Sequence, residues 1–437
     1  MELLPSQQVC FNQIMQKLRE SFSLYGFTPL DTPLMEAAEI LLAKGGGETE
    51  KQIYLLRKGD NDLALRYELT ASLAKYVALH YNDLIFPFRR FEIGKVYRGE
   101  RAQRGRFREF YQADIDIIGD GSLDILNEAE IPGVIYRCLT SLGLERFYIR
   151  MSNRKALSGL IEIIGAGYIV TDVMRAVDKL DKIGPEKLCG LLIDDLRLSQ
   201  KQSSEIMDFV ANGSDPFETL DKYKGKNEKF DIGINELLSL KTHLADFGVP
   251  ETHYKIDLSL ARGLDYYTGT VYETYISDHP EIGSIGGGGR YDNLAECFTE
   301  RKLPGVGISI GLSRLFYVLQ EQSLLNDDFH SAPADVLIIP MTDDLSHSVK
   351  LATSMRGSGL RVQIYSENKK FKSKISYADK LSIPFVVFLG EDEISKGSIT
   401  AKDMSSGEQT TASSGILTAG ICDKIRALRE GAPIKEA

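Results

Sequence analysis

The chain has 437 residues, of which 43% are hydrophobic and 26% are charged. This composition is typical of globular proteins and excludes a largely disordered chain. The length predicts two or three domains at about 100–200 residues each. No signal-peptide pattern and no run approaching about 20 apolar residues is present, so we expect a cytoplasmic protein without a membrane segment. The net charge of −10 argues against nucleic acid as a partner of the whole surface, but residues 89–108 hold eight Lys/Arg and two Glu, which form a local basic region.

Five cysteines are scattered along the chain, at positions 10, 138, 189, 297 and 422. None of them forms a Cys-x-x-Cys pair or lies at metal-ligand spacing from a histidine. We therefore expect five reduced and mostly buried thiols, and no structural metal site.

Hydrophobic periodicity predicts the first elements. Apolar residues at helical spacing predict a helix over residues 5–25, which Gly26 ends. Residues 27–36 contain two prolines and predict an extended segment that enters a helix at about Glu36. The second half of residues 64–80 is again helical in pattern. Residues 88–119 predict a long β-hairpin, with arms at 89–98 and 107–118 and a polar turn that contains a glycine.

The character of the chain then changes twice. Residues 155–247 carry apolar residues at helical spacing and predict a mainly helical insertion. Strand patterns resume at 254–258 and 270–277, and residues 305–319 predict a short strand that runs into a helix. A boundary near 326–333 separates a first domain, residues 1–325, from a last domain, residues 332–437. Alternating apolar and helical stretches in the last domain predict a small α/β fold with a partly parallel sheet.

The predicted hairpin combines cations with acceptors. Its arginines at 98, 106 and 108 could aim guanidinium groups at one ligand, and such groups suit phosphate oxygens because they donate bidentately and stay charged. Three polar residues share one face of the second arm: Gln112, Asp114 and Asp116. A cationic pocket beside an acidic one suits a ligand with phosphates and an amine. The alternative is a solvated basic hairpin with a half-exposed strand.

Four consecutive glycines, Gly286–Gly289, form a second unusual feature. Alone, such a run usually indicates a flexible turn. Because it lies between a strand and Arg290-Tyr291-Asp292, we interpret it as a place where the backbone approaches a ligand closely, which any Cβ would block.

These segments together resemble a known family. Residues 88–119 resemble motif 2 of class II aminoacyl-tRNA synthetases, in its histidyl form. Residues 305–315 resemble motif 3, and residues 27–36 resemble motif 1, whose proline, here Pro33, lies at a dimer interface. The stretch ARGLDYYTGTVYE at 261–273, followed by SIGGGGRYDN, resembles the signature of histidyl-tRNA synthetases.

The resemblance implies an architecture and a reaction. It implies an α+β class II catalytic domain, with an antiparallel sheet flanked by helices, a helical insertion and a C-terminal α/β anticodon-binding domain, in a homodimer. The implied partners are histidine, ATP with Mg²⁺, and tRNA(His). The histidine carboxylate attacks the α-phosphate of ATP to give histidyl-adenylate and pyrophosphate, and a tRNA hydroxyl then takes the histidyl group. Fixed cations at the α-phosphate are the expected catalytic device.

The resemblance also implies roles for individual residues. Arg98 and Arg262 are the implied catalytic residues, since both reach the α-phosphate, from opposite sides. The implied ATP site comprises Arg98, Glu100, Arg106, Phe110 and Arg314. The implied histidine site comprises Glu68, Thr70 and Gln112 at the ammonium, Asp116 and Tyr267 at the ring, and Tyr266 and Arg262. Arg101 and Gln103 match residues that meet the acceptor end of tRNA.

Three alternatives stay open at this point. Tyr266 and Tyr267 could be ordinary strand aromatics. The lysines at 369, 370, 372 and 374 and Tyr365 could contact tRNA, or could form a solvated charged loop. A non-catalytic paralogue of the family, the histidine-binding regulatory subunit of ATP phosphoribosyltransferase, shares the catalytic fold. That paralogue generally lacks the last domain and the arginines, and this chain has both.

Overall fold

The computed structural model describes residues 2–43, 50–100, 105–210, 216–261, 266–324 and 332–430. Residues 16–324 form one compact unit, and the chain after residue 324 forms a second one together with residues 2–15. The first element is helix α1 (Pro5–Leu24), whose apolar stripe is buried and which ends before Gly26, as the sequence predicts. None of the described helices is long and apolar enough to cross a membrane.

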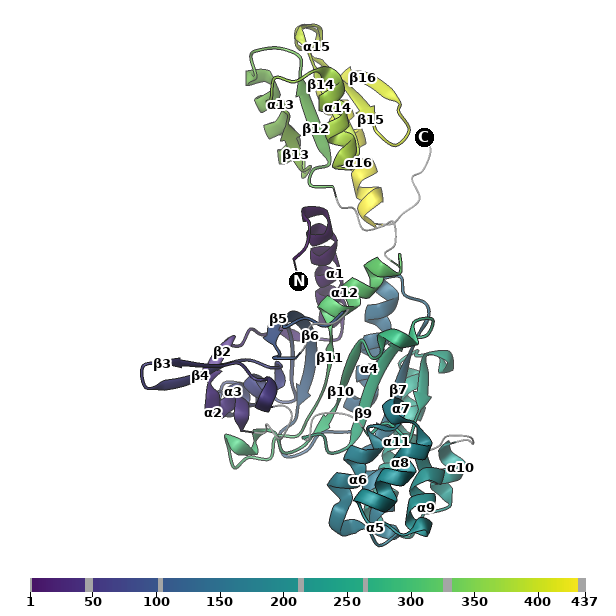
Figure 1. Cartoon of the computed structure of the whole chain (residues 1–437). Helices are drawn as coiled ribbons and strands as arrows, with labels where there is room; N and C mark the ends of the chain where they lie inside the picture. Colours follow the sequence, from purple (N-terminus) through teal and green to yellow (C-terminus); the bar gives the residue numbers. More distant parts are fainter. Residues whose placement is uncertain are drawn as a thin grey trace. The chain divides into compact units, whose positions relative to one another are not determined.

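An eight-stranded sheet forms the body of the first unit (Figure 1). Its neighbouring strands pair antiparallel, except for one parallel pair at each edge, β1 with β5 and β7 with β8. In spatial order the strands are β1 (Thr28–Pro29), β5 (Phe88–Tyr97), β6 (Glu109–Ile118), β11 (Gly305–Ile310), β10 (Gly286–Tyr291), β9 (Thr270–Ile276), β7 (Phe147–Asn153) and β8 (Tyr254–Ile256). The predicted hairpin is β5 and β6, which pair over ten residues each.

A small second sheet corrects one prediction. The helix expected at about Glu36 begins at Ala38 instead. Residues Met35–Ala37 form strand β2, because they pair with β4 (Asn61–Leu65), which in turn pairs with β3 (Leu55–Lys58). Helices around these sheets are α2 (Ala38–Leu42), α3 (Thr70–Leu79), α4 (Leu126–Ser141) and α12 (Leu312–Glu321).

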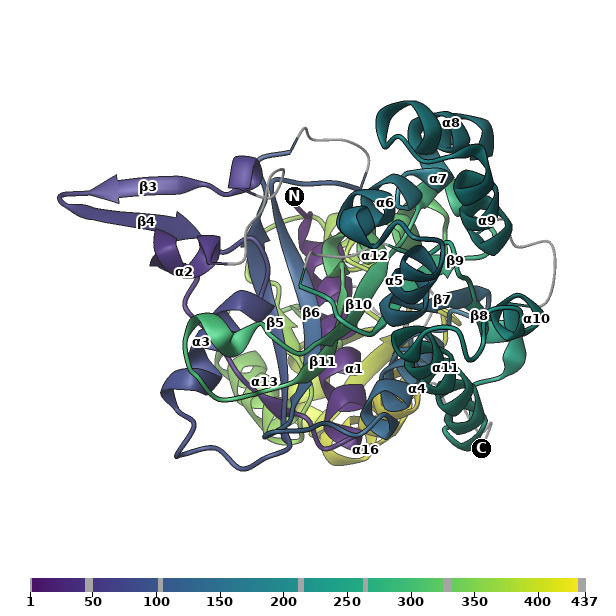
Figure 2. The ribbon, with the colours of Figure 1, turned by 90° about the horizontal axis from the view of Figure 1, so that it is seen from below.

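Helices fill the segment between β7 and β8. Figures 1 and 2 show them gathered beside β7 and β9, at the end of the large sheet away from the β3–β4 hairpin. They are α5 (Arg154–Ile163), α6 (Val170–Val177), α7 (Leu180–Ile183), α8 (Pro185–Gly190), the π-helical turn η3 (Leu191–Asp195), α9 (Gln200–Val210), α10 (Pro216–Asp221) and α11 (Glu228–Asp246).

The second unit has a five-stranded sheet with helices. Its first three strands in space are parallel and the last two pairings are antiparallel, which confirms the predicted partly parallel sheet. The strand order is β13 (Val362–Ile364), β12 (Val336–Pro340), β14 (Phe385–Leu389), β15 (Ser398–Asp403) and β16 (Gln409–Ser413). The helices are α13 (Ser346–Gly357), α14 (Phe371–Lys380), α15 (Glu391–Lys396) and α16 (Ser414–Glu430). Every residue of β12 is buried, as is typical of a parallel strand covered on both faces.

The cysteines are all free, as expected, but the expectation that most of them are buried is wrong. Cys10 and Cys138 are buried, Cys189 and Cys422 are half-buried, and Cys297 is exposed. The burial of each cysteine depends on which face of its helix or strand meets the core. The number and spacing of the cysteines do not reveal this.

Candidate active site

A cavity of about 1050 Å³ lies in the first unit, above one face of the large sheet. Arg262, Arg101 and Gln103 lie outside the described residues. All the other predicted site residues line this cavity: Glu68, Thr70, Arg98, Glu100, Arg106, Phe110, Gln112, Asp116, Tyr266, Tyr267 and Arg314. They come from the start of α3, the hairpin, the segment before β9 and helix α12, so the fold brings together side chains almost 250 residues apart in sequence.

One end of the cavity is cationic. The guanidinium of Arg98 lies 4.3 Å from the ring centre of Tyr67 and 5.1 Å from that of Phe110. Its Nε donates to the Tyr67 carbonyl at 3.3 Å, so both rings and the backbone fix its direction. Phe110, which the resemblance places in the ATP site, is half-buried and contacts this guanidinium.

Two more arginines share that end. Arg314 donates through Nη1 to the Ser284 carbonyl at 2.7 Å, and Arg106 lies 3.6 Å from Glu100. Burial and the nearby charge of Arg106 lower the pKa of Arg314. Because these like charges repel each other, an anion bound between them would be stabilised.

The other end of the cavity is acidic. Gln112, Asp114 and Asp116 lie on one face of β6, as predicted, and each is at least 94% buried, so the alternative of a half-exposed strand is wrong. The amide of Gln112 donates to the hydroxyl of Ser309 on β11. Polar side chains are therefore presented to a ligand in a place where water has little access.

Glu68 closes this end at the start of α3. Its carboxylate accepts hydrogen bonds from the backbone N–H groups of Thr70 and Ala71, both at 2.6 Å. A carboxylate at a helix N-terminus is favoured because the first N–H groups of a helix lack partners. Glu68 is held in one orientation as a result, with Thr70 beside it.

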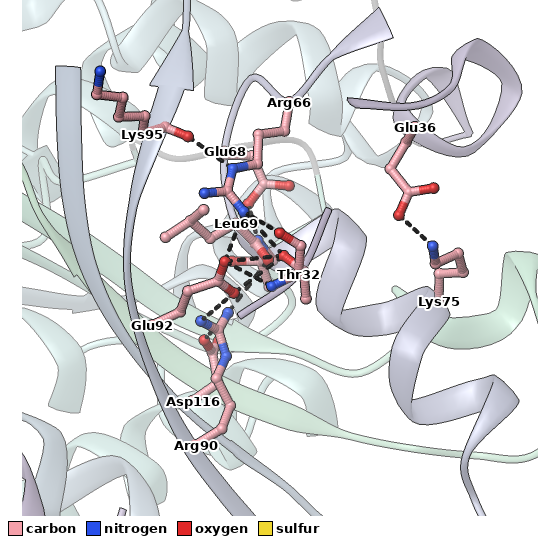
Figure 3. Close-up of polar contacts among 11 residues, drawn as sticks. Thr32, Glu36, Arg66, Glu68, Leu69, Lys75, Arg90, Glu92, Lys95 and Asp116 are labelled. Atoms are coloured by element: carbon pink, nitrogen blue, oxygen red, sulfur yellow. Dashed lines mark hydrogen bonds and ion pairs between the residues drawn. The ribbon is translucent and has the colours of Figure 1, made fainter. Parts of the chain in front are cut away.

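A buried network holds Asp116 in place (Figure 3). Arg90 is fully buried and approaches Asp116 at 2.7 Å, and its Nη2 also donates to the Leu69 carbonyl at 3.3 Å. Its Nη1 lies 3.5 Å from Glu92, which in turn pairs with Arg66 at 2.7 Å. The network thus joins the hairpin to the loop before α3, where Glu68 lies.

Asp116 has a second partner, since the hydroxyl of Tyr291 donates to its Oδ1 at 2.5 Å. Burial raises the pKa of Asp116 to about 6, although Arg90 and Tyr291 act to lower it. Burial also raises the pKa of Tyr267, and the charges of Glu68 and Asp116 raise it further, so this tyrosine stays protonated and can donate.

Comparison with known proteins shows which family the chain resembles. A family model described as "Histidyl-tRNA synthetase" matches residues 1–315. The chain belongs to the histidyl-tRNA synthetase family. A second model, "Anticodon binding domain", matches residues 335–419, so the expected class II catalytic domain and anticodon-binding domain are both confirmed.

Individual relatives agree with this assignment. The chain is 49% identical to the histidine–tRNA ligase of Clostridium tetani and 43% identical to that of Finegoldia magna, over 94% of this chain in both cases and 94% and 95% of those chains. The crystal structure of a histidyl-tRNA synthetase from Nostoc sp. PCC 7120 superposes with a TM-score of 0.87 at 35% identity and covers 97% of both chains. These relatives span both domains, which does not favour the regulatory-subunit alternative.

The structure gives the glycine run a cause within the sheet, and the close approach to a ligand stays a prediction. Gly286–Gly289 form most of β10, and Gly286, Gly287 and Gly288 line the cavity of this synthetase-family chain. A Cβ on Gly288 would lie 2.1 Å from the carbonyl oxygen of Gly307 on β11. The neighbouring strand therefore requires glycine there, with or without a ligand.

Three residues of the site escaped the sequence reasoning: Arg90, Tyr291 and Ser309. Tyr291 lies within the stretch SIGGGGRYDN, which carries part of the family resemblance, so the sequence could have indicated it. Arg90 faces Asp116 because β5 and β6 pair in that register, and Ser309 faces Asp114 because β11 pairs with β6. The sequence pattern of a single strand does not reveal its register against a neighbouring strand, so neither contact could be predicted from it.

Proposed function

We propose that this chain is a histidine–tRNA ligase, which activates histidine with ATP and transfers it to the 3′ end of tRNA(His). The observation that carries this proposal is one cavity with a cationic end and an acidic end. Histidine carries a carboxylate and an ammonium, and the reaction joins that carboxylate to a phosphate. A cavity with separated charges orients the amino acid with its carboxylate toward the nucleotide, which is the geometry that the first step requires.

The cationic end fits the triphosphate. We assign the α-phosphate to Arg98 and the outer phosphates to Arg106 and Arg314, with Phe110 against the adenine. Negative charge grows at the α-phosphate during attack, and a guanidinium already fixed by two rings stabilises it without reorganisation. Arg262 would supply a further cation at the histidine carboxylate.

Mg²⁺ with ATP usually keeps one or two protein carboxylates among its ligands. Glu100 and Glu273 both line the cavity and act electrostatically on Arg314, so they fit such an ion at this end. The ion would neutralise charge on the phosphates.

The acidic end fits the amino acid. We assign the ammonium to Glu68, Thr70 and Gln112, and the ring to Asp116 and Tyr267 with Tyr266 beside them. A pocket that bonds the ring nitrogens leaves its own polar groups unpaired when an apolar side chain enters, and such pockets discriminate by about 10⁴–10⁵.

tRNA and a second subunit complete the proposal. We assign Arg101 and Gln103 to the acceptor end of tRNA and the last domain to the anticodon loop, and we expect the enzyme in the cytoplasm with its tRNA substrate.

A homodimer through the segment around Pro33 is supported by exposed apolar side chains on β2 and β3 and beside them: Leu34, Met35, Leu55 and Leu56. Leu55→Asp with Leu56→Asp should shift sedimentation to the monomer, whereas Tyr168→Asp, an exposed site on the insertion, should not.

The deciding experiment is histidine-dependent exchange of pyrophosphate into ATP. We expect exchange with histidine, none with the other amino acids, and charging of tRNA(His) by the same preparation. Absence of exchange, or equal exchange with several amino acids, would refute the proposal.

A further inference from the structure

The acidic end of the cavity holds a carboxylate that the assigned roles do not use. Asp114 on β6 lines the cavity and is 2% exposed. Its Oδ1 accepts no hydrogen bond from the residues that the structure describes, and the same holds for Oε1 of Gln112, one position earlier on the same face. Buried polar atoms normally have partners, so two adjacent acceptors without one indicate the position of a donor ligand.

The cross-strand pairing explains why Asp114 lacks a cation of its own. It lies opposite Glu92 on β5 and opposite Ser309 on β11. Arg66 pairs with Glu92, and Arg90 lies 2.7 Å from Asp116. No ion pair to Asp114 occurs among the described residues. Around Asp114 the described part of the chain places four buried carboxylates and two buried guanidinium groups, those of Arg66 and Arg90. The carboxylates are Glu68, Glu92, Asp114 and Asp116.

The charges around Asp114 also favour a cationic ligand group at this position. Burial raises the pKa of Asp114 well above its usual value, and the charges of Asp116 and Glu68 raise it further. The charge of Arg90 and a side-chain hydrogen bond with Ser309 act to lower it. A bound cation would restore the ionised form, so this position favours a cationic ligand group over a neutral one.

We propose that Asp114 accepts a hydrogen bond from the α-ammonium of the bound amino acid and is a further residue that selects it. An ammonium has three donors, whereas a neutral imidazole has one, which Asp116 is placed to accept. Glu68 already accepts two backbone N–H bonds, one at each oxygen. Among the described residues, Oδ1 of Asp114 and Oε1 of Gln112 accept no hydrogen bond, and neither lies in an ion pair, whereas Oδ2 of Asp116 lies 2.7 Å from Arg90. This inference rests on the proposed function, because it takes histidine as the ligand.

The test compares two ligands in one variant. Imidazole-4-propionate keeps the ring and the carboxylate of histidine but lacks the ammonium. In Asp114→Asn we expect the KM for histidine in pyrophosphate exchange to rise about tenfold to a hundredfold, as for loss of a charge-assisted hydrogen bond. The inhibition constant of imidazole-4-propionate should change by less than about threefold, because the lost interaction is to a group that it lacks.

Glu130→Gln is the matched control, since this carboxylate pairs with Arg89 and does not line the cavity. It should leave both constants unchanged. Asp114→Ser, measured in the same way, replaces the asparagine variant if that one melts below the assay temperature. Equal weakening of both ligands, or no change in the KM for histidine, overturns the role of Asp114. A wild-type enzyme without histidine-dependent exchange overturns the proposed function instead.

Discussion

Replacing Arg90 with methionine tests whether one buried guanidinium holds the acidic end of the cavity together. Arg90 is fully buried, 2.7 Å from Asp116 and 3.5 Å from Glu92. Methionine keeps much of the length and removes the charge, which leaves Asp116 a buried carboxylate without this cation. Removing one partner of a buried pair costs about 3–5 kcal/mol of unfolding free energy, and we expect a loss in that range.

The loss has a pH dependence whose sign follows from the structure. The pKa of Asp116 is about 6 with Arg90 present, and Arg90 acts to lower it, so the pKa in the variant is higher still. The unfolded chain has a pKa of about 3.9 for this group. The folded variant therefore binds the proton more tightly than the unfolded chain does, and its stability deficit shrinks as the pH falls from 8 toward 6. Urea denaturation at pH 6, 7 and 8 measures the deficit at each pH.

Two further variants make this test specific. Arg89→Met changes the neighbouring arginine, which pairs with Glu130 at a partly exposed position and should cost only about 1 kcal/mol. Asp116→Asn in the Arg90→Met background removes the orphaned charge and should restore part of the stability. The reasoning is refuted if Arg90→Met costs no more than Arg89→Met, or if the double variant is as unstable as Arg90→Met at pH 8.

Three other predictions concern the ligands. In Gly307→Ala the new Cβ would lie 2.1 Å from Oδ1 of Asp116, so the KM for histidine should rise about tenfold or more while the KM for ATP stays unchanged in exchange kinetics. Arg314→Gln should lower kcat about 10²–10³-fold and leave histidine affinity, measured by calorimetry, unchanged; a loss of histidine affinity would contradict the assignment. The affinity for 1,2,4-triazole-3-alanine, whose ring stays neutral, should fall about tenfold per pH unit below about 6 as Asp116 takes a proton. Asp116→Asn should bind this analogue with a flat pH profile.

The sequence predicted those parts of the site that depend on local periodicity. Alternation along residues 107–118 placed Gln112, Asp114 and Asp116 on one face, and the structure confirms it, because successive side chains of a strand point to opposite sides. The same reasoning predicted α1 and the ends of the hairpin. In each case the responsible interaction lies within a few residues of the pattern that predicted it.

The parts that escaped prediction depend on distant pairing. Met35–Ala37 follow a proline-containing segment and precede a helix, and only their pairing with β4 makes them a strand. The contact of Arg90 with Asp116 depends on the register of β5 against β6. Gly288 of β10 is required by the backbone of β11, about twenty residues later in the chain. A single sequence does not show which strands will be neighbours, so it could not reveal these requirements.

The two ends of the cavity place different demands on the protein, and this separates an enzyme from a protein that only binds histidine. Recognition of the amino acid needs the acidic end, with Asp116 and its partners Arg90 and Tyr291. The pair of Arg106 and Arg314 at the other end serves no such purpose, since burial and then the charge of Arg106 lower the pKa of Arg314 and destabilise its charged form. The repulsion between the two arginines is outweighed when an anion of several charges binds between them and attracts both. ATP is such an anion. The cationic end is therefore the feature that would be expected to disappear from a purely regulatory histidine-binding protein, and this chain retains it.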